Sequence, residues 1–181
     1  MKKSAKIFIL LIPVIISTVV AQSDTDWFPL AEGNWWLYES EGFVLDDSDT
    51  ISMSGTIYTV IKEELMHDNG FLVYAFQTIM NIDMLPDTSD VFLRHADGEL
   101  RSYHSLSSDQ YDVWITYTET NLEPEIIVPA GNFSNCTVIT LPFVYGITIE
   151  HFLHRGTGIV KTEFSGVFYN TTESLSDFNL N

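Results

Sequence analysis

Apolar and polar residues alternate with a period of two along much of this chain, which is the spacing of a half-buried β-strand. The clearest example is the segment 111–118, in which Tyr111, Val113, Ile115 and Tyr117 occupy every second position. Helical periodicity is weak throughout. The pattern therefore predicts that β-strands are the main elements of the fold.

Two hairpins are marked by turns that contain glycine. Residues 56–61 and 71–80 are β-branched and aromatic runs, and the Asn-Gly pair at 69–70 between them can take the positive φ angles of a tight turn. The Asp-Gly pair at 97–98 marks a second hairpin in the same way. Further strands are expected at 35–44, 91–95, 99–104, 111–118, 125–128, 137–141, 148–154 and 159–164.

About nine or ten strands at this spacing predict an all-β fold with little helix. We expect a single antiparallel, strongly curved sheet that forms a half-barrel or a barrel-like shell. Residues 71–80 are apolar on both faces, which suits a sheet with a filled inside and a covered outside. The β domain is expected to span residues 22–169, and the polar residues 170–181 are expected to form a frayed C-terminal tail.

The first 21 residues have the parts of a secretory signal peptide. Lys2, Lys3 and Lys6 form a charged beginning, an apolar run of 14 residues follows at 7–20, and small residues lead to a cleavage site after Ala21. The run is shorter than the roughly 20 residues that span a bilayer. We therefore predict an exported bacterial protein, periplasmic or extracellular, that is not an integral membrane protein after cleavage.

The mature chain is strongly acidic. All 25 Asp and Glu residues and five of the eight Lys and Arg residues follow Ala21, so its formal net charge is 5 − 25 = −20. Such a surface disfavours nucleic acid, whose binding depends on Lys and Arg contacts to phosphates. We interpret the charge as a solvating coat on a monomer, with divalent cations or a cationic partner as the alternative.

The segment V-P-A-G-N-F-S-N-C at 128–136 ends in the single cysteine of the chain. Pro129 cannot donate a ladder hydrogen bond, and Gly131 permits a turn closed to other residues. Phe133 is then expected to fold back onto the sheet. No cation stands near Cys136 to lower the pKa of its thiol, so we predict a buried structural residue rather than a reactive one.

Three stretches together carry a resemblance. These are W-F-P-L-A-E-G-N-W-W-L-Y at 27–38, V-P-A-G-N-F-S-N-C at 128–136, and R-G-T-G-I-V-K at 155–161, which holds Gly156 and Gly158. In that order they resemble a group of exported bacterial β-proteins, similar in style to the half-barrels of the lipoprotein-carrier type. The resemblance implies a secreted or periplasmic antiparallel β protein in which these turn residues are structural. It implies no catalytic residues.

No metal or cofactor is predicted. The histidines are His67, His95, His104, His151 and His154. His95 and His104 flank one turn and could meet across a hairpin, but a zinc site would need one or two further ligands. His151 and His154 are expected on opposite faces of one strand. Asp46, Asp47 and Asp49 offer oxygen ligands, but their loop lacks the glycine and the distal glutamate of a calcium-binding EF-hand.

The sequence favours a binding protein over an enzyme. It contains no nucleophile elbow, phosphate-binding loop or dinucleotide fingerprint. Its many aromatic residues fit a core first, but some could line a pocket, and the candidates for a cavity wall are Trp36, Tyr74, Phe76 and Trp114.

The leading hypothesis is a non-enzymatic, envelope-accessory domain that holds an apolar small molecule or a segment of an envelope protein on the concave face of the sheet. One alternative is a cell-surface structural or adhesion module. A second is a hydrolase that uses a carboxylate pair, whose separation cannot be read from sequence.

Overall fold

The computed structural model describes residues 27–46, 49–83, 87–117, 122–142 and 147–181. These residues form one antiparallel 11-stranded sheet, so the predicted all-β, curved-sheet fold is confirmed, with slightly more strands than expected. The strands are β1 (Trp35–Asp46), β2 (Asp49–Met66), β3 (Leu72–Ile82), β4 (Asp87–Ala96), β5 (Glu99–Tyr103), β6 (Tyr111–Thr116), β7 (Leu122–Val128), β8 (Gly131–Pro142), β9 (Thr148–His154), β10 (Gly158–Ser165) and β11 (Tyr169–Asn179).

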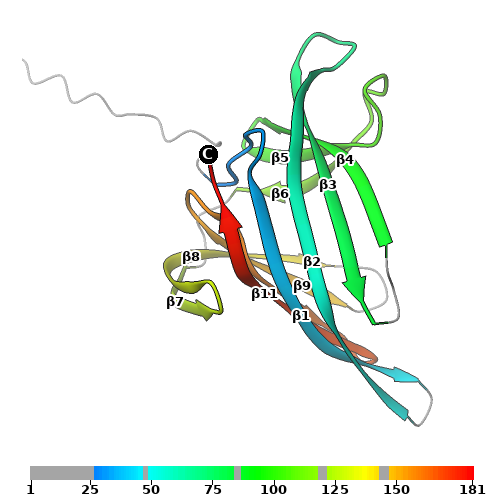
Figure 1. Cartoon of the computed structure of the whole chain (residues 1–181), viewed down its shortest axis with the longest axis vertical. Helices are drawn as coiled ribbons and strands as arrows, with labels where there is room; N and C mark the ends of the chain where they lie inside the picture. Colours follow the sequence, from blue (N-terminus) through cyan, green and yellow to red (C-terminus); the bar gives the residue numbers. More distant parts are fainter. Residues whose placement is uncertain (1–26, 47–48, 84–86, 118–121, 143–146) are drawn as a thin grey trace, which may run out of the picture.

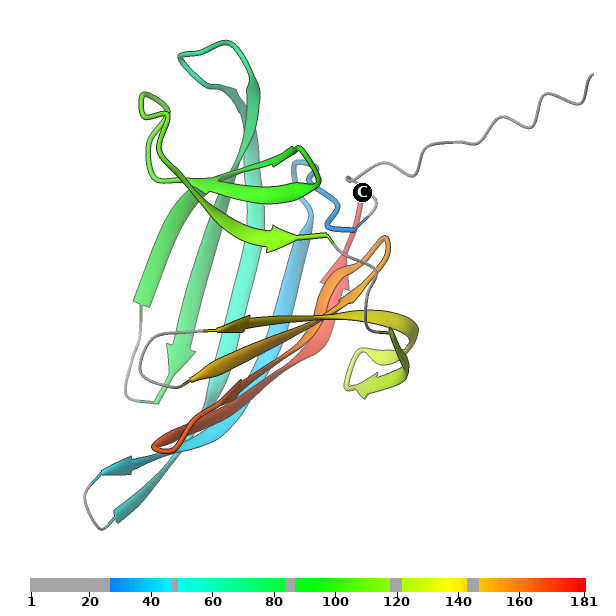
Figure 2. The same ribbon diagram turned by 180° about the vertical axis from the view of Figure 1, so that it is seen from behind.

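The sheet consists of two meanders that meet at its centre. Its strand order is β6-β5-β4-β3-β2-β1-β11-β10-β9-β8-β7 (Figure 1). The first and last strands of the described chain, β1 and β11, are therefore central neighbours, and the two edge strands β6 and β7 follow each other in sequence. Both flanks bend toward the same side of the central strands, which gives the sheet its half-barrel shape (Figure 2).

The core lies on the concave face, where every second side chain of the central strands points inward. Fully buried apolar side chains of this core include Trp36, Ile61, Leu93, Leu100, Ile115, Leu153, Val160 and Leu175. Phe28, from the segment before β1, enters the same core, and its ring stacks on that of Trp36 with centroids 4.8 Å apart. This segment is tied to the other end of the chain, because the backbone N–H of Asn181 donates to Oδ1 of the buried Asn34 at 2.7 Å.

The prediction of a frayed tail at 170–181 is wrong, because β11 occupies Tyr169–Asn179 at the centre of the sheet. On this strand Thr171 and Leu175 are buried, and Glu173 lies between them on the same face. Thr and Glu on the inward face made the segment look solvated. The period of two was present, but its inward set carries one aliphatic residue.

Strict alternation also fails in β6. Leu100 pairs with Ile115 and Arg101 pairs with Val113, so Trp114 is an extra residue opposite no partner. Such a β-bulge changes which face a side chain reaches. Trp114 and Ile115 consequently both pack against the core, although strict alternation would place them on opposite faces, and Val113 stays 47% exposed.

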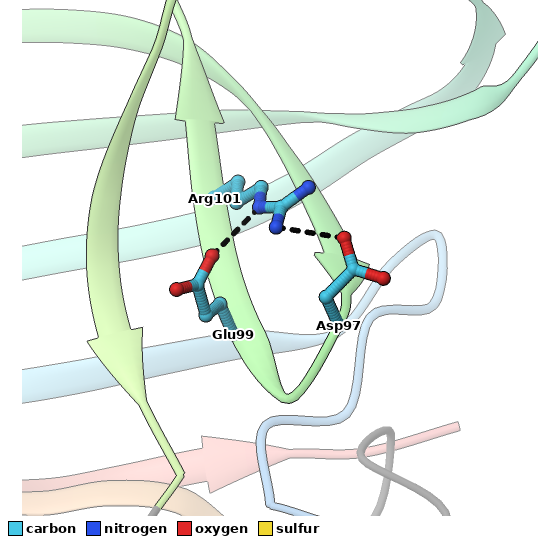
Figure 3. A network of polar contacts seen from close by, with 3 residues as sticks. All are labelled: Asp97, Glu99 and Arg101. Atoms are coloured by element: carbon cyan, nitrogen blue, oxygen red, sulfur yellow. Dashed lines mark hydrogen bonds and ion pairs between the residues drawn. The ribbon is translucent and has the colours of Figure 1, made fainter.

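The Asp97-Gly98 turn forms as predicted, with φ angles of 55° and 76°. Arg101 fastens this hairpin, since its Nε donates to Glu99 Oε2 and a terminal nitrogen donates to Asp97 Oδ2, both at 2.8 Å (Figure 3). Its guanidinium also lies 4.5 Å from the centroid of the Tyr111 ring on β6. The charge-assisted bonds and the ring contact hold one edge of the sheet together.

The outer face of β3 is covered next to the turn at 67–70. Val73 is fully buried there, and the Phe71 ring stacks on His67 with centroids 4.3 Å apart. The guanidinium carbon of Arg94 lies 4.0 Å from the centroid of the Phe71 ring. This small cluster explains why residues 71–80 are apolar on both faces.

The predicted signal peptide with its cleavage site at Ala21, and Asp47 of the acidic loop, lie outside the described residues. Within the described part of the chain, no helix is long and apolar enough to cross a membrane.

Candidate functional site

A cavity of about 530 Å³ lies on the concave face of the half-barrel. Strands from both meanders contribute to its wall, namely β1, β2, β3 and β6 from one side and β8 to β11 from the other. Most of the wall is apolar, with Ile57, Met80, Leu141, Ile149, Ile159 and Phe164 among its residues. The volume falls within the range of about 300–1,000 Å³ that is usual for small-molecule sites.

Two of the four aromatic residues proposed for a cavity wall line this cavity. They are Phe76 of β3 and Trp114 of β6, whose rings meet edge to face with centroids 5.4 Å apart. Trp36 does not line the cavity, because the Phe28 ring stacked against it covers it. Tyr74 packs at the margin of the core, beside its direct partner Glu64 on β2.

A row of polar side chains crosses the concave face. Ser40 of β1 is the direct partner of Glu173 on β11, Glu173 is the partner of Thr162 on β10, and Thr162 is the partner of His151 on β9. Direct partners in an antiparallel sheet have Cβ atoms about 4.5–5.5 Å apart on one face. Four neighbouring strands thus present four polar groups side by side, and Glu173, Thr162 and His151 line the cavity itself.

Glu173 is the acid in the cavity wall. Its carboxylate has no hydrogen bond or ion pair with any other described residue, and part of its surface stays exposed to the cavity. Burial among the surrounding strands raises the pKa of this carboxyl to about 7. The carboxylate is therefore a group in the cavity that protein atoms leave unsatisfied.

Tyr38 of β1 lines the wall beside this acid. Its hydroxyl donates to the backbone oxygen of Ile159 at 3.0 Å. Burial, and secondarily the charge of Glu173, raise the pKa of Tyr38, so the phenol stays neutral. Because this proton is already donated across the core, Tyr38 fixes the position of β1 against β10.

His151 ends the polar row. Its Nδ1 lies 3.0 Å from the Thr162 hydroxyl, and the ring is almost fully buried. Burial lowers the pKa of the imidazole to about 4, so the ring is neutral at physiological pH. A neutral imidazole offers one donor and one acceptor, and the bond to Thr162 uses one of them.

Glu173, Thr162 and His151 were not predicted from the sequence as a common site. Glu173 was placed in the expected tail, so no strand was predicted there that could bring it beside Thr162 on β10, the partner of His151 on β9. For Thr162 and His151 the available signal was a polar residue at an inward position of a strand that is otherwise apolar on that face.

The first and third motifs of the resemblance meet in the structure. The indole Nε1 of Trp36 donates to the backbone oxygen of Thr157 at 2.7 Å. Gly156 and Gly158 both have positive φ angles, 79° and 96°. A Cβ atom on Gly158 would lie 2.8 Å from a ring carbon of Phe28, so this glycine makes room for the buried ring as well as the turn.

The second motif forms the turn between β7 and β8. Val128 pairs with Gly131, whose φ angle is 140°, and Pro129 and Ala130 lie at the tip. The Ala130 N–H donates to the backbone oxygen of Leu175 at 3.0 Å. The turn is thereby anchored to the central strand β11.

Phe133 and Cys136 fill the space behind that turn. The Phe133 ring is buried and meets the His154 ring edge to face with centroids 5.2 Å apart. Cys136 is fully buried, and its thiol donates to the backbone oxygen of Phe133 at 3.7 Å. Burial raises the pKa of this thiol to about 11, which disfavours the thiolate.

The histidines have separate surroundings. His95 and His104 do not meet: His95 contacts the backbone oxygen of Phe28 at 2.8 Å, whereas His104 contacts Asp112 at 3.0 Å on the surface. Among the residues that the structure describes, no group of three or more His, Cys, Asp or Glu side chains is placed to hold a metal ion.

Comparisons by sequence give no relative: no protein-family model matches the chain, and no curated protein matches it. Solved structures with a similar fold include a protein from Parabacteroides distasonis provisionally described as a lipoprotein. It is 12% identical, with a TM-score of 0.52 over 84% of this chain and 97% of that one.

A second similar structure is that of a protein from Bacteroides fragilis, which is provisionally described as an exported protein and has a YmcC-like fold. It is 11% identical, with a TM-score of 0.51 over 85% of this chain and 99% of that one. At these identities the likeness establishes the fold alone. This chain therefore has the curled-sheet architecture of those two bacterial proteins over nearly their whole length.

Proposed function

We propose that this protein is an exported, non-enzymatic domain of the cell envelope that holds an apolar small molecule in the cavity of its half-barrel. The observation that carries the proposal is the cavity of about 530 Å³, which both meanders line mainly with apolar side chains. The signal-peptide pattern before Ala21 supports export, and the provisional descriptions of the two similar structures agree with it.

The composition of the wall argues against the hydrolase alternative. A glycoside hydrolase needs two carboxyl groups about 5–10 Å apart across its substrate. Among the described residues that line the cavity, Glu173 is the sole acid. A single carboxyl in an apolar cavity can orient a ligand, but it cannot supply both the acid and the second carboxylate that glycoside hydrolysis requires.

Filling the cavity tests the proposal. Thr78 of β3 lines the cavity, whereas its neighbour Ile79 is 39% exposed and faces the outside. Thr78→Trp is expected to abolish binding of an apolar fluorescent probe such as N-phenyl-1-naphthylamine, and the matched control Ile79→Trp is expected to bind like the wild type. Circular dichroism and urea unfolding show whether both variants are folded.

Native mass spectrometry of protein purified from its own envelope tests the same idea without a chosen probe. A co-purifying apolar molecule that Thr78→Trp excludes supports the proposal. An unliganded mass under all conditions, together with probe binding that Thr78→Trp leaves unchanged, would contradict it.

An unliganded mass together with unchanged probe binding would favour the alternative of a surface or adhesion module. The structure offers such a module an apolar patch, where the β1–β2 hairpin lies next to the β10–β11 turn. There the Leu45 N–H donates to the Phe168 backbone oxygen at 2.8 Å, and Phe168 and Val167 are 69% and 76% exposed. Exposed apolar patches of this kind often mark interaction sites.

A further inference from the structure

We propose that the cavity selects single-chain amphiphiles with a protonated amine head group, which Glu173 binds while the chain lies against the apolar wall. This inference rests on the proposed binding function and adds the chemical class of the ligand. It follows from three features of the site: an unpartnered carboxylate, the neutral polar groups beside it, and the charge of the whole chain.

The carboxylate is available to a ligand. Glu173 lines the cavity, and no hydrogen bond or ion pair joins it to another described residue. The described basic side chains nearest in sequence are engaged elsewhere: Lys161 pairs with Glu163, and Arg155 lies over the Trp27 ring. A buried carboxylate without a partner is costly, and a ligand that supplies a cation would remove that cost.

The neighbours of the carboxylate suit an ammonium group. An alkylammonium has three N–H donors and no acceptor, as the Lys side chain has. Ser40 and Thr162 flank Glu173 as direct cross-strand partners, and each carries a hydroxyl oxygen that can accept. One charge-assisted bond to the carboxylate, with hydroxyl acceptors on both sides, would satisfy the head group.

Other head groups fit less well. A fatty acid would bring a second negative charge beside Glu173, into a chain whose formal net charge is already −17. Like charges that share an apolar site repel each other strongly. An alcohol could hydrogen-bond to the carboxylate but would leave its charge uncompensated. The wall beyond the polar row, which includes Ile149, Leu141 and Phe164, is apolar and accommodates the chain.

The pH dependence follows from the groups that face Glu173. Two titratable side chains line the cavity near it, Tyr38 on β1 and His151 on β9, while β10 contributes the neutral Thr162. The raised pKa of Tyr38 and the lowered pKa of His151 keep both neutral between pH 5.5 and 8. Glu173 is therefore the group that ionises in this range, and amine binding is expected to strengthen as the pH rises.

The experiment compares decylamine, decanol and decanoate, titrated below their micellar concentrations into the full mature protein at pH 8 and pH 5.5. The change in the tryptophan fluorescence of the protein, to which Trp114 in the cavity wall contributes, reports occupancy, and calorimetry checks it. For the wild type we expect decylamine to bind at least tenfold more tightly than decanol or decanoate at pH 8, with a smaller preference at pH 5.5.

Glu173→Gln keeps the shape of the side chain and removes its charge. It is expected to abolish the preference for the amine, so that decylamine binds no more tightly than decanol at either pH. The matched control is Glu163→Gln, because Glu163 lies on the opposite face of β10 and pairs with Lys161. This control should keep the full preference.

The outcomes separate the two proposals. If decanol or decanoate binds the wild type as tightly as decylamine, the amine inference is overturned while the cavity function stands. An amine preference that survives Glu173→Gln overturns it as well. If none of the three compounds binds and the fluorescent probe also fails, the proposed function falls together with the inference.

Discussion

Replacing Glu173 with Gln should stabilise the ligand-free protein at pH 8 and change it little at pH 5. Burial raises the pKa of the Glu173 carboxyl from its ordinary 4.5 to about 7. Between these values the folded chain retains a proton that the unfolded chain releases, so the free energy of unfolding falls as the pH rises. Below this window both states are protonated and the difference vanishes, whereas above it the whole cost is present.

The magnitude follows from the size of the change in pKa. From 4.5 to about 7 the difference is about 2.5, and each unit corresponds to about 1.4 kcal/mol, which gives an upper value of about 3 kcal/mol. Part of the carboxyl surface faces the cavity, where water screens it. We therefore expect Glu173→Gln to gain about 1–3 kcal/mol at pH 8 and less than about 1 kcal/mol at pH 5.

The assay is urea unfolding of the wild type and the variant at both pH values, followed by circular dichroism. The difference between the two proteins is the informative quantity, because the lowered pKa of His151 makes both lose stability as the pH falls from 6.5 toward 4. Glu163→Gln, on the outer face, serves as the control and should show no such pH-dependent gain. The reasoning is refuted if Glu173→Gln is no more stable than the wild type at pH 8, or if its gain is equal at both pH values.

Three further predictions concern the motifs. Trp36→Phe removes one buried hydrogen bond and should lower the free energy of unfolding by about 1–2 kcal/mol. The control Trp35→Phe, at a half-buried position, should lower it by less. Equal losses in the two variants would contradict the role of the Trp36 indole N–H. Gly156→Ala meets no atom within 4 Å and should cost about 1 kcal/mol through its positive φ alone. Gly158→Ala adds a steric clash with the buried Phe28 ring, so its loss of stability in thermal unfolding should be at least twice that of Gly156→Ala. A smaller loss than that of Gly156→Ala would show that the Phe28 ring moves aside freely. The Cys136 thiol should resist Ellman's reagent at pH 8 until urea unfolds the chain, and modification of the native protein within minutes would show that the thiol is accessible.

Local patterning was enough to predict most of the strands, with β11 as the exception. Alternation and β-branched runs predicted most of them within a few residues, because a sheet with one face on a core must place apolar side chains at every second position. The Asp97-Gly98 pair predicted its turn for an equally local reason, since both residues adopt the positive φ angles that this hairpin requires. The acidic charge and the leader pattern are likewise properties of the chain alone.

The tertiary structure decided the order of the strands and hence the site. Pairing β1 with β11 turns residues 170–179 from an expected tail into the centre of the sheet, and this pairing spans nearly the whole chain. No local pattern shows which distant strands are neighbours, so Ser40 joins the row of Glu173, Thr162 and His151 only once β1 of one meander pairs with β11 of the other. The sequence thus set which side chains face inward, and the strand order set which of them share one cavity, because cross-strand contact depends on register and not on separation along the chain.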